Sequence, residues 1–134
     1  DNWWCTRDDV FCGVGARYPV DGFGHGTHVA GTIVAGDGIG VAPGARWIAA
    51  RACAGRNCPA GWIIGSVQWL LSLKHDRQPD VVNVSLGTDN PIEAGLFLPV
   101  FNRLHALGIV VVAASGNHAG ILQAPARGRR ALDG

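Results

Sequence analysis

The sequence predicts an α/β fold, a three-layer arrangement in which a parallel sheet carries helices on both faces. Patterns typical of strands and of helices alternate along the chain, and such alternation produces the right-handed crossovers of a parallel sheet. One predicted strand, residues 109–114, is almost wholly apolar, which is typical of a strand buried on both faces. The 134 residues suffice for one domain of ordinary size.

The first half of the chain predicts a loop, a helix and a strand. Residues 1–24 are rich in Asp, Gly and aromatic side chains and predict irregular structure. Residues 25–35 carry small and apolar side chains at helical spacing and precede a glycine that can end a helix. Residues 46–53 follow a Pro-Gly turn and predict a strand.

The second half predicts two helices and two strands. Residues 60–74 have apolar side chains at the spacing of an amphipathic helix, and residues 80–86 predict a strand. The next helix, residues 90–107, begins with Asn as its cap and Pro in its first turn, and we expect Pro99 to kink it. The strand 109–114 is the last predicted element, and the predicted elements together make up an incomplete three-layer fold.

The composition excludes several classes of protein. Apolar residues make up 48% of the chain and charged residues 16%, which argues against intrinsic disorder. A net charge of +1 provides no field that would hold a nucleic-acid backbone. No apolar run approaches the roughly 18–20 residues of a membrane span. The chain has no Met and starts at Asp1 without a signal region, so we expect a removed start or a piece of a longer protein.

The four cysteines form two local pairs, Cys5 with Cys12 and Cys53 with Cys58. Their spacing favours two short disulfide-closed loops, which would place the protein in an oxidising, extracellular environment. Two alternatives stay open: reduced, partly buried thiols of a cytosolic protein, and a zinc site formed with nearby histidines. The pairs lack the C-x2-C spacing of zinc knuckles, so we predict no metal site.

Two regions of the sequence indicate chemistry. Ligands of parallel sheets bind beyond the carboxyl ends of the strands, where the segments 85–87 (SLG) and 115–117 (SGN) lie. The most specific motif is residues 24–32, GHGTHVAGT. Its first histidine, His25, lies between glycines in the first turn of a predicted helix, where a neutral imidazole can accept a proton from a hydroxyl nucleophile.

Four segments together resemble the subtilisin-like serine peptidases, family S8, and occur in the order of that family. They are the histidine motif, the turn 40–45 (GVAPGA), the substrate-binding strand 82–87 (VNVSLG) and the oxyanion-hole strand 111–117 (VVAASGN). The run PGARWIAAR, together with Asn2 and Trp3, further resembles the bacillopeptidase F-like branch.

The resemblance implies a peptidase that requires no cofactor, with roles for particular residues. His25 would be the general base, and the Asn117 side chain would donate a hydrogen bond to the oxyanion. The segment Ser85, Leu86 and Gly87 would pair with an extended peptide or protein substrate by strand addition. Small residues would leave room for a bulky apolar group before the cleaved bond: Ala113, Ala114, Ser115 and Gly116.

Each of these residues also has a plainer interpretation. His25 and His28 could both be structural, and we expect this of His28, because only the first histidine matches the catalytic position. Asn117 could form a turn, and residues 85–87 could simply end a strand. Asp21 is too close to His25 in sequence to be the triad acid, which the family takes from a separate strand much further upstream.

Two parts of the triad that the family uses in the order Asp, His, Ser are missing. The family's acid lies in a D-[ST]-G turn and its nucleophile in a G-T-S-x-A string, and neither occurs in residues 1–134. The four serines lie elsewhere, at positions 66, 72, 85 and 115. We therefore expect residues 1–134 to be the central part of a subtilisin-like domain, inactive by itself.

Three functions compete on this basis. The first is a secreted serine endopeptidase domain, represented by part of its sequence. The second is a pseudoenzyme or truncated module that binds peptides without a nucleophile, and the third is a zinc-binding module. The segment between His28 and Val41 is short for the calcium loop of many relatives, so calcium is left open without support.

Overall fold

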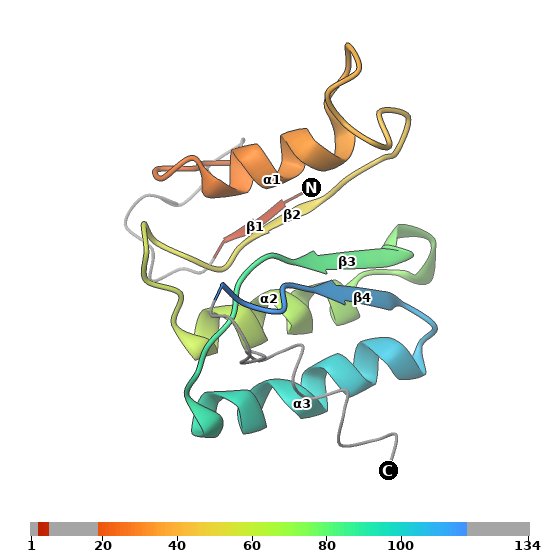
Figure 1. Ribbon diagram of the computed structural model, residues 1–134. Helices are drawn as coiled ribbons and strands as arrows, with labels where there is room; N and C mark the ends of the chain where they lie inside the picture. Colours follow the sequence, from red (N-terminus) through yellow and green to blue (C-terminus); the bar gives the residue numbers. More distant parts are fainter. Residues whose placement is uncertain (1–2, 6–18, 118–134) are drawn as a thin grey trace. The chain divides into compact units, whose positions relative to one another are not determined.

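The computed structural model describes residues 3–5 and 19–117, in which helices alternate with short strands (Figure 1). This alternation confirms the predicted α/β class. The elements in chain order are β1 (Trp3–Cys5), α1 (His25–Val34), β2 (Ala49–Arg51), α2 (Ala60–Ser72), a 3₁₀ turn (His75–Arg77), β3 (Val81–Val84), α3 (Pro91–Ala106) and β4 (Val110–Ala113).

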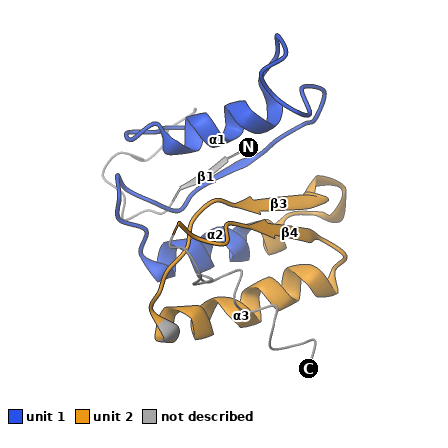
Figure 2. Cartoon of the chain, viewed as in Figure 1, with its two compact units in different colours: residues 1–69 blue, residues 70–134 orange. Residues whose placement is uncertain are grey.

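The chain divides into two compact units, residues 1–69 and residues 70–134 (Figure 2). Within the described residues the strands form two pairs, β1 with β2 and β3 with β4, and both pairs are parallel. Parallel neighbours need long connections between them, usually a helix. The predicted parallel arrangement is therefore confirmed for each pair of strands.

Strand β1 corrects the prediction that residues 1–24 are irregular throughout. It pairs with β2 from Trp3 opposite Ala49 to Cys5 opposite Arg51. This partner lies far along the chain, so no local pattern indicates the strand. The same pairing limits β2 to three residues, fewer than predicted, because ladder hydrogen bonds form only opposite a partner strand.

Helix α1 ends one residue earlier than predicted, and the following loop folds back over its last turn. Ala35 is extended, while the amide of Gly40 donates to the Ala35 carbonyl at 3.0 Å and that of Ala42 to the Ile33 carbonyl at 2.8 Å. A Cβ on Gly40 would lie 2.4 Å from the Ala35 nitrogen. This close approach of two backbone segments requires glycine.

Helix α2 is amphipathic as predicted, with Ile63, Val67 and Leu70 buried. It ends at Ser72, two residues before the predicted end. The 3₁₀ turn, which the sequence analysis did not predict, is followed by Gln78, whose side-chain amide donates to the Leu73 carbonyl at 3.2 Å. Gln78 thereby satisfies a backbone acceptor that the end of the helix leaves without an intrahelical partner.

The second unit contains a β3–α3–β4 crossover. Strand β3 pairs with β4 from Val81 opposite Val110 to Val84 opposite Ala113. One further backbone hydrogen bond, from the Ala114 amide to the Val84 carbonyl at 3.1 Å, extends the ladder. Both predicted strands are confirmed in position, with shorter bounds.

Helix α3 is held at both ends by local capping. The Asn90 side chain accepts a hydrogen bond from the Ile92 amide at 3.0 Å, which confirms the predicted N-cap. At the other end Gly108 has a φ of +78°, and the amides of Gly108 and Ile109 donate to carbonyls of the last turn in a Schellman motif. The helix continues through Pro99 without a break.

The core of the second unit is apolar and centres on α3, which packs against β4. Phe97 and Leu104 on α3 are 2% and 0% exposed, and Val84 and Ile109 are buried as well. The Phe97 ring meets the Phe101 ring edge-on at 6.3 Å between centroids. This packing anchors the crossover, so it also holds the carboxyl ends of β3 and β4 in place.

Candidate active site

His25 is the first residue of helix α1, as the sequence predicted. Gly24 before it is the N-cap residue with a φ of +88°, a conformation that glycine adopts without strain. The His28 amide donates to the Gly24 carbonyl at 3.0 Å and closes the first turn. The His25 side chain is exposed, so its imidazole is accessible to a reacting group.

The carboxylate of Asp21 holds the start of this helix from outside. One oxygen accepts hydrogen bonds from the amide and the hydroxyl of Thr27, each at 2.7 Å, and the other accepts from the amides of Gly24 at 2.8 Å and Phe23 at 3.1 Å. Helix N-termini present amides without intrahelical partners and favour negative charge. Asp21 therefore joins the loop before His25 to the first turn of α1.

The hydrogen bonds around Asp21 also control its ionisation. Burial raises the pKa of the Asp21 carboxyl, whereas hydrogen bonds from the Thr27 amide and hydroxyl and from the Gly24 and Phe23 amides lower it. The hydrogen bonds together outweigh burial and hold the pKa of this carboxyl well below its usual value. Asp21 is thus a permanent anion at neutral pH, engaged with its own loop. The sequence alone did not predict this role of Asp21, although the Asp-Gly turn before the helix could have indicated it.

The second group of predicted site residues lies at the carboxyl ends of β3 and β4. Ser85, Leu86 and Gly87 directly follow β3, and Ala114, Ser115, Gly116 and Asn117 directly follow β4. Because Val84 pairs with Ala113 in parallel register, the two segments start side by side at the same edge of the sheet (Figure 1). The structure therefore brings these predicted residues together.

The exposure of these segments suits contact with a ligand. The side chains of Ala114, Ser115 and Asn117 are exposed, and Ser85 and Leu86 are half-buried. The Ser85 hydroxyl accepts a hydrogen bond from the Asn83 side chain at 2.9 Å, which links the strand to the segment that follows it. His25 belongs to the first unit and these segments to the second, so the two groups of residues are built on separate elements.

A disulfide closes the loop after β2 in the first unit. Cys53 and Cys58 are joined, which confirms this predicted pair, whereas Cys12 of the other pair lies outside the described residues. Inside the loop, Arg56 places its guanidinium carbon 5.6 Å from the centroid of the Phe23 ring. Nothing in the sequence analysis indicated this contact, because Phe23 and Arg56 lie on different loops.

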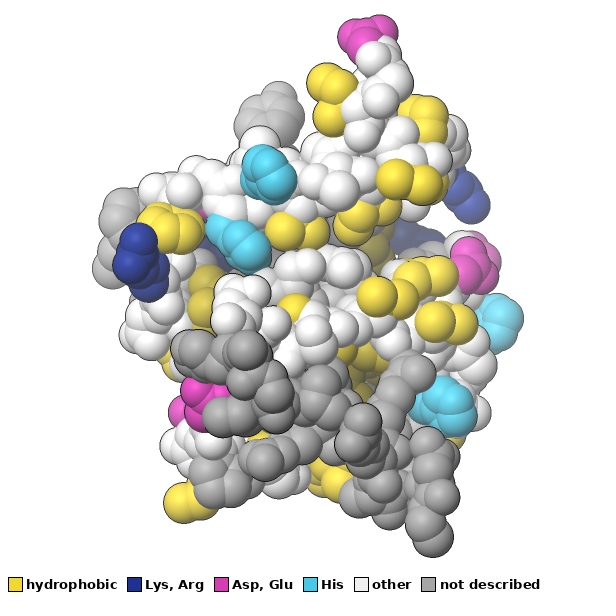
Figure 3. All heavy atoms as spheres, viewed as in Figure 1, with side chains coloured by type: hydrophobic (Ala, Val, Ile, Leu, Met, Phe, Trp, Pro, Cys, Tyr) yellow, Lys and Arg dark blue, Asp and Glu magenta, His cyan; other side chains and the backbone are white. Residues whose placement is uncertain are grey.

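Figure 3 shows the surface around α1: two histidine side chains stand over the helix, and a basic and a hydrophobic side chain lie together at the end where the helix starts.

In the part of the chain that the structure describes, no three His, Cys, Asp or Glu side chains lie close enough to hold a metal ion. Among the same residues, no helix has both the length and the apolar character that crossing a membrane would need.

Comparisons with known proteins agree with these elements. The sequence model of the subtilase family, Peptidase_S8, matches residues 13–131. The chain is 38% identical to subtilisin E of Bacillus subtilis (strain 168) over 102 residues, which make up 72% of this chain and 25% of that protein. It is 36% identical over 117 residues to subtilisin Savinase of Lederbergia lenta (84% of this chain, 42% of the relative). It is 35% identical over 115 residues to bacillopeptidase F of Bacillus subtilis (strain 168), covering 77% of this chain and 8% of the relative. The chain thus spans less than half the length of each relative.

Proposed function

Because the chain belongs to the subtilase family, we propose that it is the central part of the catalytic domain of a subtilisin-like serine endopeptidase. The observation that carries the proposal is the parallel pairing of Val84 with Ala113. This pairing sets residues 85–87 beside residues 114–117, the segments that would bind the substrate backbone and the oxyanion. The triad Asp and Ser come from parts of the full-length protein outside residues 1–134.

His25 acts as the general base of this reaction. As the serine oxygen attacks the carbonyl carbon of the substrate, its proton passes to the imidazole of His25, and the imidazolium then protonates the leaving amine as the C–N bond breaks. In the second half of the reaction a water molecule replaces the serine as the nucleophile. His25 accepts the proton of the water and returns it to the serine oxygen as the acyl group is released. The exposed position at the start of α1 supports this role, because the ring must reach both the nucleophile and the leaving group.

Asn117 and the strand ends stabilise and orient the substrate. The Asn117 side-chain amide donates a hydrogen bond to the oxyanion of the tetrahedral intermediate. Residues 85–87 pair with the extended substrate through backbone hydrogen bonds, as an added strand. The small side chains of residues 113–116 leave space for a large apolar group on the residue before the cleaved bond.

The remaining parts of the proposal concern fold, location and cofactors. In the full-length protein the strands join one parallel sheet covered by helices on both faces, the three-layer form of the family. The Cys53–Cys58 disulfide supports an extracellular location, because disulfides persist in oxidising compartments. The reaction uses no cofactor, and the loop of residues 35–41 offers Asp37 as its single carboxylate, whereas calcium takes six to eight oxygen ligands.

The test is made on the full-length product of the gene that encodes this chain. We expect D-[ST]-G and G-T-S-x-A motifs in the sequence on either side, and labelling of one serine by a fluorophosphonate probe. His25→Ala should abolish the labelling, and His105→Ala, which removes an exposed histidine on α3, should leave it intact. A protein that binds peptides but has neither motif nor any labelled serine would be a pseudoenzyme, and the proposal would be wrong.

A further inference from the structure

Two contacts, one from the end of β2 and one from the disulfide loop, reach the segment that precedes His25. The Arg51 side chain, at the end of β2, donates a hydrogen bond to the Val20 carbonyl at 2.6 Å. Further along, the Arg56 guanidinium carbon lies 5.6 Å from the centroid of the Phe23 ring. Both contacts lie within the first unit, so the loop of residues 53–58 is held against residues 20–23.

The backbone of the loop that carries Arg56 is constrained. The Cys53–Cys58 disulfide closes its base, and the amides and carbonyls of Ala54 and Asn57 bond each other reciprocally at 2.8 Å and 3.1 Å. Gly55, with a φ of +59°, then makes the tight turn that leaves Arg56 at the tip. A loop whose backbone is ordered in this way before binding loses less conformational entropy when a ligand arrives.

The backbone that carries Phe23, the other half of the contact, is also held in place. Phe23 lies two residues before His25, and its amide donates to Asp21 at 3.1 Å. Two residues of extended chain span at most about 7 Å, so the Phe23 backbone lies within that distance of the His25 backbone. Both Asp21 oxygens are already engaged by Thr27, Gly24 and Phe23. The Arg56–Phe23 pair is therefore a cationic and aromatic surface next to the proposed general base.

At 5.6 Å from the centroid of the Phe23 ring, the Arg56 guanidinium is within range of a cation–π contact, and a guanidinium can donate two parallel hydrogen bonds to the oxygens of a carboxylate. Resting on the proposed function, we propose that Arg56, held over Phe23 by the disulfide loop, selects an acidic side chain in the substrate within two residues of the cleaved bond. Arg56 and Phe23 are both exposed, so the surface is open to a passing peptide. This selection is electrostatic and acts close to His25. It does not depend on residues 113–116, which would leave space for a large apolar group of the substrate.

The experiment measures peptide cleavage by the full-length protein. Peptides share one cleavage site and carry Glu, Gln or Lys at each of the four positions within two residues of the bond. At one position we expect the kcat/KM for Glu to exceed that for Gln by about fivefold, the effect of a favourable exposed ion pair. The preference should decrease with added salt, since salt screens exposed charges.

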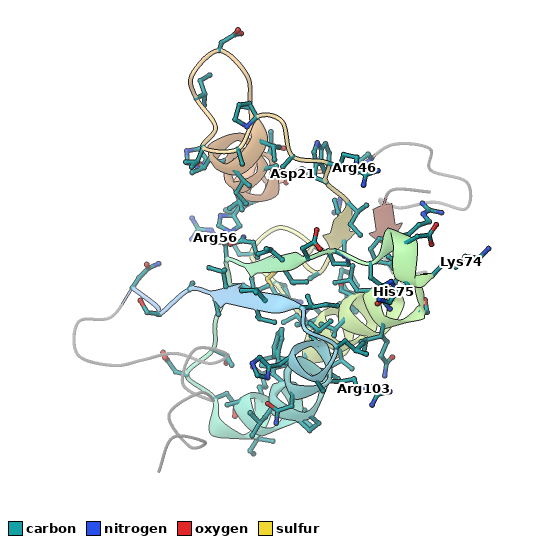
Figure 4. All side chains as sticks on the ribbon, turned by 90° about the vertical axis from the view of Figure 1, so that its right-hand side faces the viewer. Asp21, Arg46, Arg56, Lys74, His75 and Arg103 are labelled. Atoms are coloured by element: carbon teal, nitrogen blue, oxygen red, sulfur yellow. A yellow bond between two sulfur atoms is a disulfide. The ribbon has the colours of Figure 1, made fainter. Side chains whose placement is uncertain are left out.

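Variants test whether the preference for Glu in the substrate depends on Arg56 and its loop. Arg56→Gln should bring the Glu-to-Gln ratio of kcat/KM to about one, and Arg56→Lys should give an intermediate ratio, because Lys lacks the planar fork. The double variant Cys53→Ala with Cys58→Ala should lower the ratio by releasing the loop. Arg46→Gln is the matched control, because Arg46 is exposed in the same unit and lies well apart from Arg56 (Figure 4); it should leave the ratio unchanged.

Two results overturn the inference and are distinguishable. Hydrolysis with the same Glu-to-Gln ratio in the unmodified protein and in Arg56→Gln would disprove the role of Arg56 alone. A full-length protein that cleaves none of the peptides and takes no fluorophosphonate label would disprove the peptidase function together with this inference.

Discussion

At the scale of single residues, Asp21 has the best-defined role in the chain. Its four hydrogen bonds connect the loop before His25 with the first turn of α1. The helix has no side-chain cap at Gly24, so this more distant carboxylate serves the same purpose. The position of the proposed general base consequently depends on a residue outside the helix.

Asp21→Ala should destabilise the full-length protein by about 1 kcal/mol at neutral pH, the typical cost of losing an N-terminal cap. The folded-state pKa of Asp21 is lowered, so its contribution is fully present above the unfolded value of about 3.9. The contribution is lost as the pH falls through the lower folded-state pKa. Urea unfolding of both proteins across this acid range measures it.

Asp21→Asn serves as the comparison, since it keeps one acceptor oxygen and removes the charge. We expect a smaller loss than for Asp21→Ala. Solvent screening of this exposed side chain keeps the purely electrostatic part small. A difference between the unmodified protein and Asp21→Ala that stays constant from pH 7 to pH 2 would contradict the role of the ionised carboxylate.

Asn117→Ala in the full-length protein should lower kcat by about 10²–10³ and leave KM nearly unchanged. The magnitude is that of the oxyanion asparagine of subtilisin, a relative of this chain, and the reason is that the hydrogen bond forms with charge that develops only in the transition state. Asn102→Ala is the control, because this exposed amide lies on α3. Equal kcat values for the two variants would exclude Asn117 from the oxyanion site.

At the scale of elements, the turns at the ends of the helices set the direction of the chain that follows them. The Schellman motif at Gly108 ends α3 and starts the segment that leads into β4. Around Gly40, the loop after α1 returns over the last turn of the helix before the chain proceeds to β2. These turns determine the direction of the strands that follow, so changes in them affect more than the turn itself.

Gly40→Ala should destabilise the protein by about 1–3 kcal/mol, the usual cost of forcing an extra carbon into filled space. The new Cβ would lie 2.4 Å and 2.6 Å from the backbone nitrogen and oxygen of Ala35, and backbone atoms cannot move aside cheaply. Gly44→Ala is the matched control, because no atom lies within 4 Å of its Cβ position. Thermal unfolding that shifts equally for both variants would show that the close approach does not matter.

At the scale of the whole molecule, the described residues form two units with one parallel strand pair each. One face of the β3–β4 pair carries exposed valines, with Val81, Val110 and Val112 exposed at 55%, 51% and 50%. Exposed apolar strands favour association with other chains. The proposed function places the missing triad residues, and further sheet, outside residues 1–134.

The isolated 134-residue chain should show no fluorophosphonate labelling and no peptide hydrolysis. A triad without its serine retains only binding and oxyanion stabilisation, which a covalent serine probe does not detect. Labelling of Ser66, Ser72, Ser85 or Ser115 in this chain would contradict the assignment of the nucleophile to another part of the protein. Mass spectrometry of the probe-treated chain makes the measurement.

The isolated chain should also associate in solution. We expect oligomers in sedimentation velocity, and Val112→Lys, which adds a charge to the exposed face, should shift the distribution toward the monomer. Asn102→Lys, which adds the same charge at an exposed position on α3, should not. A sharp, reversible two-state melt of a monomeric chain would contradict this prediction.

Some features could be predicted because their causes lie close together in sequence. The start of α3 follows from Asn90 and the proline after it, and the Cys53–Cys58 pair follows from a spacing of five residues. The segments 85–87 and 115–117 were recognised at the ends of strands whose apolar character is local as well. By contrast, β1 was missed, because only the distant strand β2 makes it a strand.

The sequence by itself determined the α/β class, the helix boundaries to within two residues, the local disulfide and the motifs of the subtilase family, since capping, spacing, periodicity and short motifs are properties of neighbouring residues. Only the tertiary structure decided that Asp21 holds the start of α1, that Arg56 lies over Phe23, and that Val84 pairs with Ala113. The physical reason is that hydrogen bonds and ring contacts depend on where folding brings separate segments together. The local sequence patterns do not show which of these distant segments come into contact.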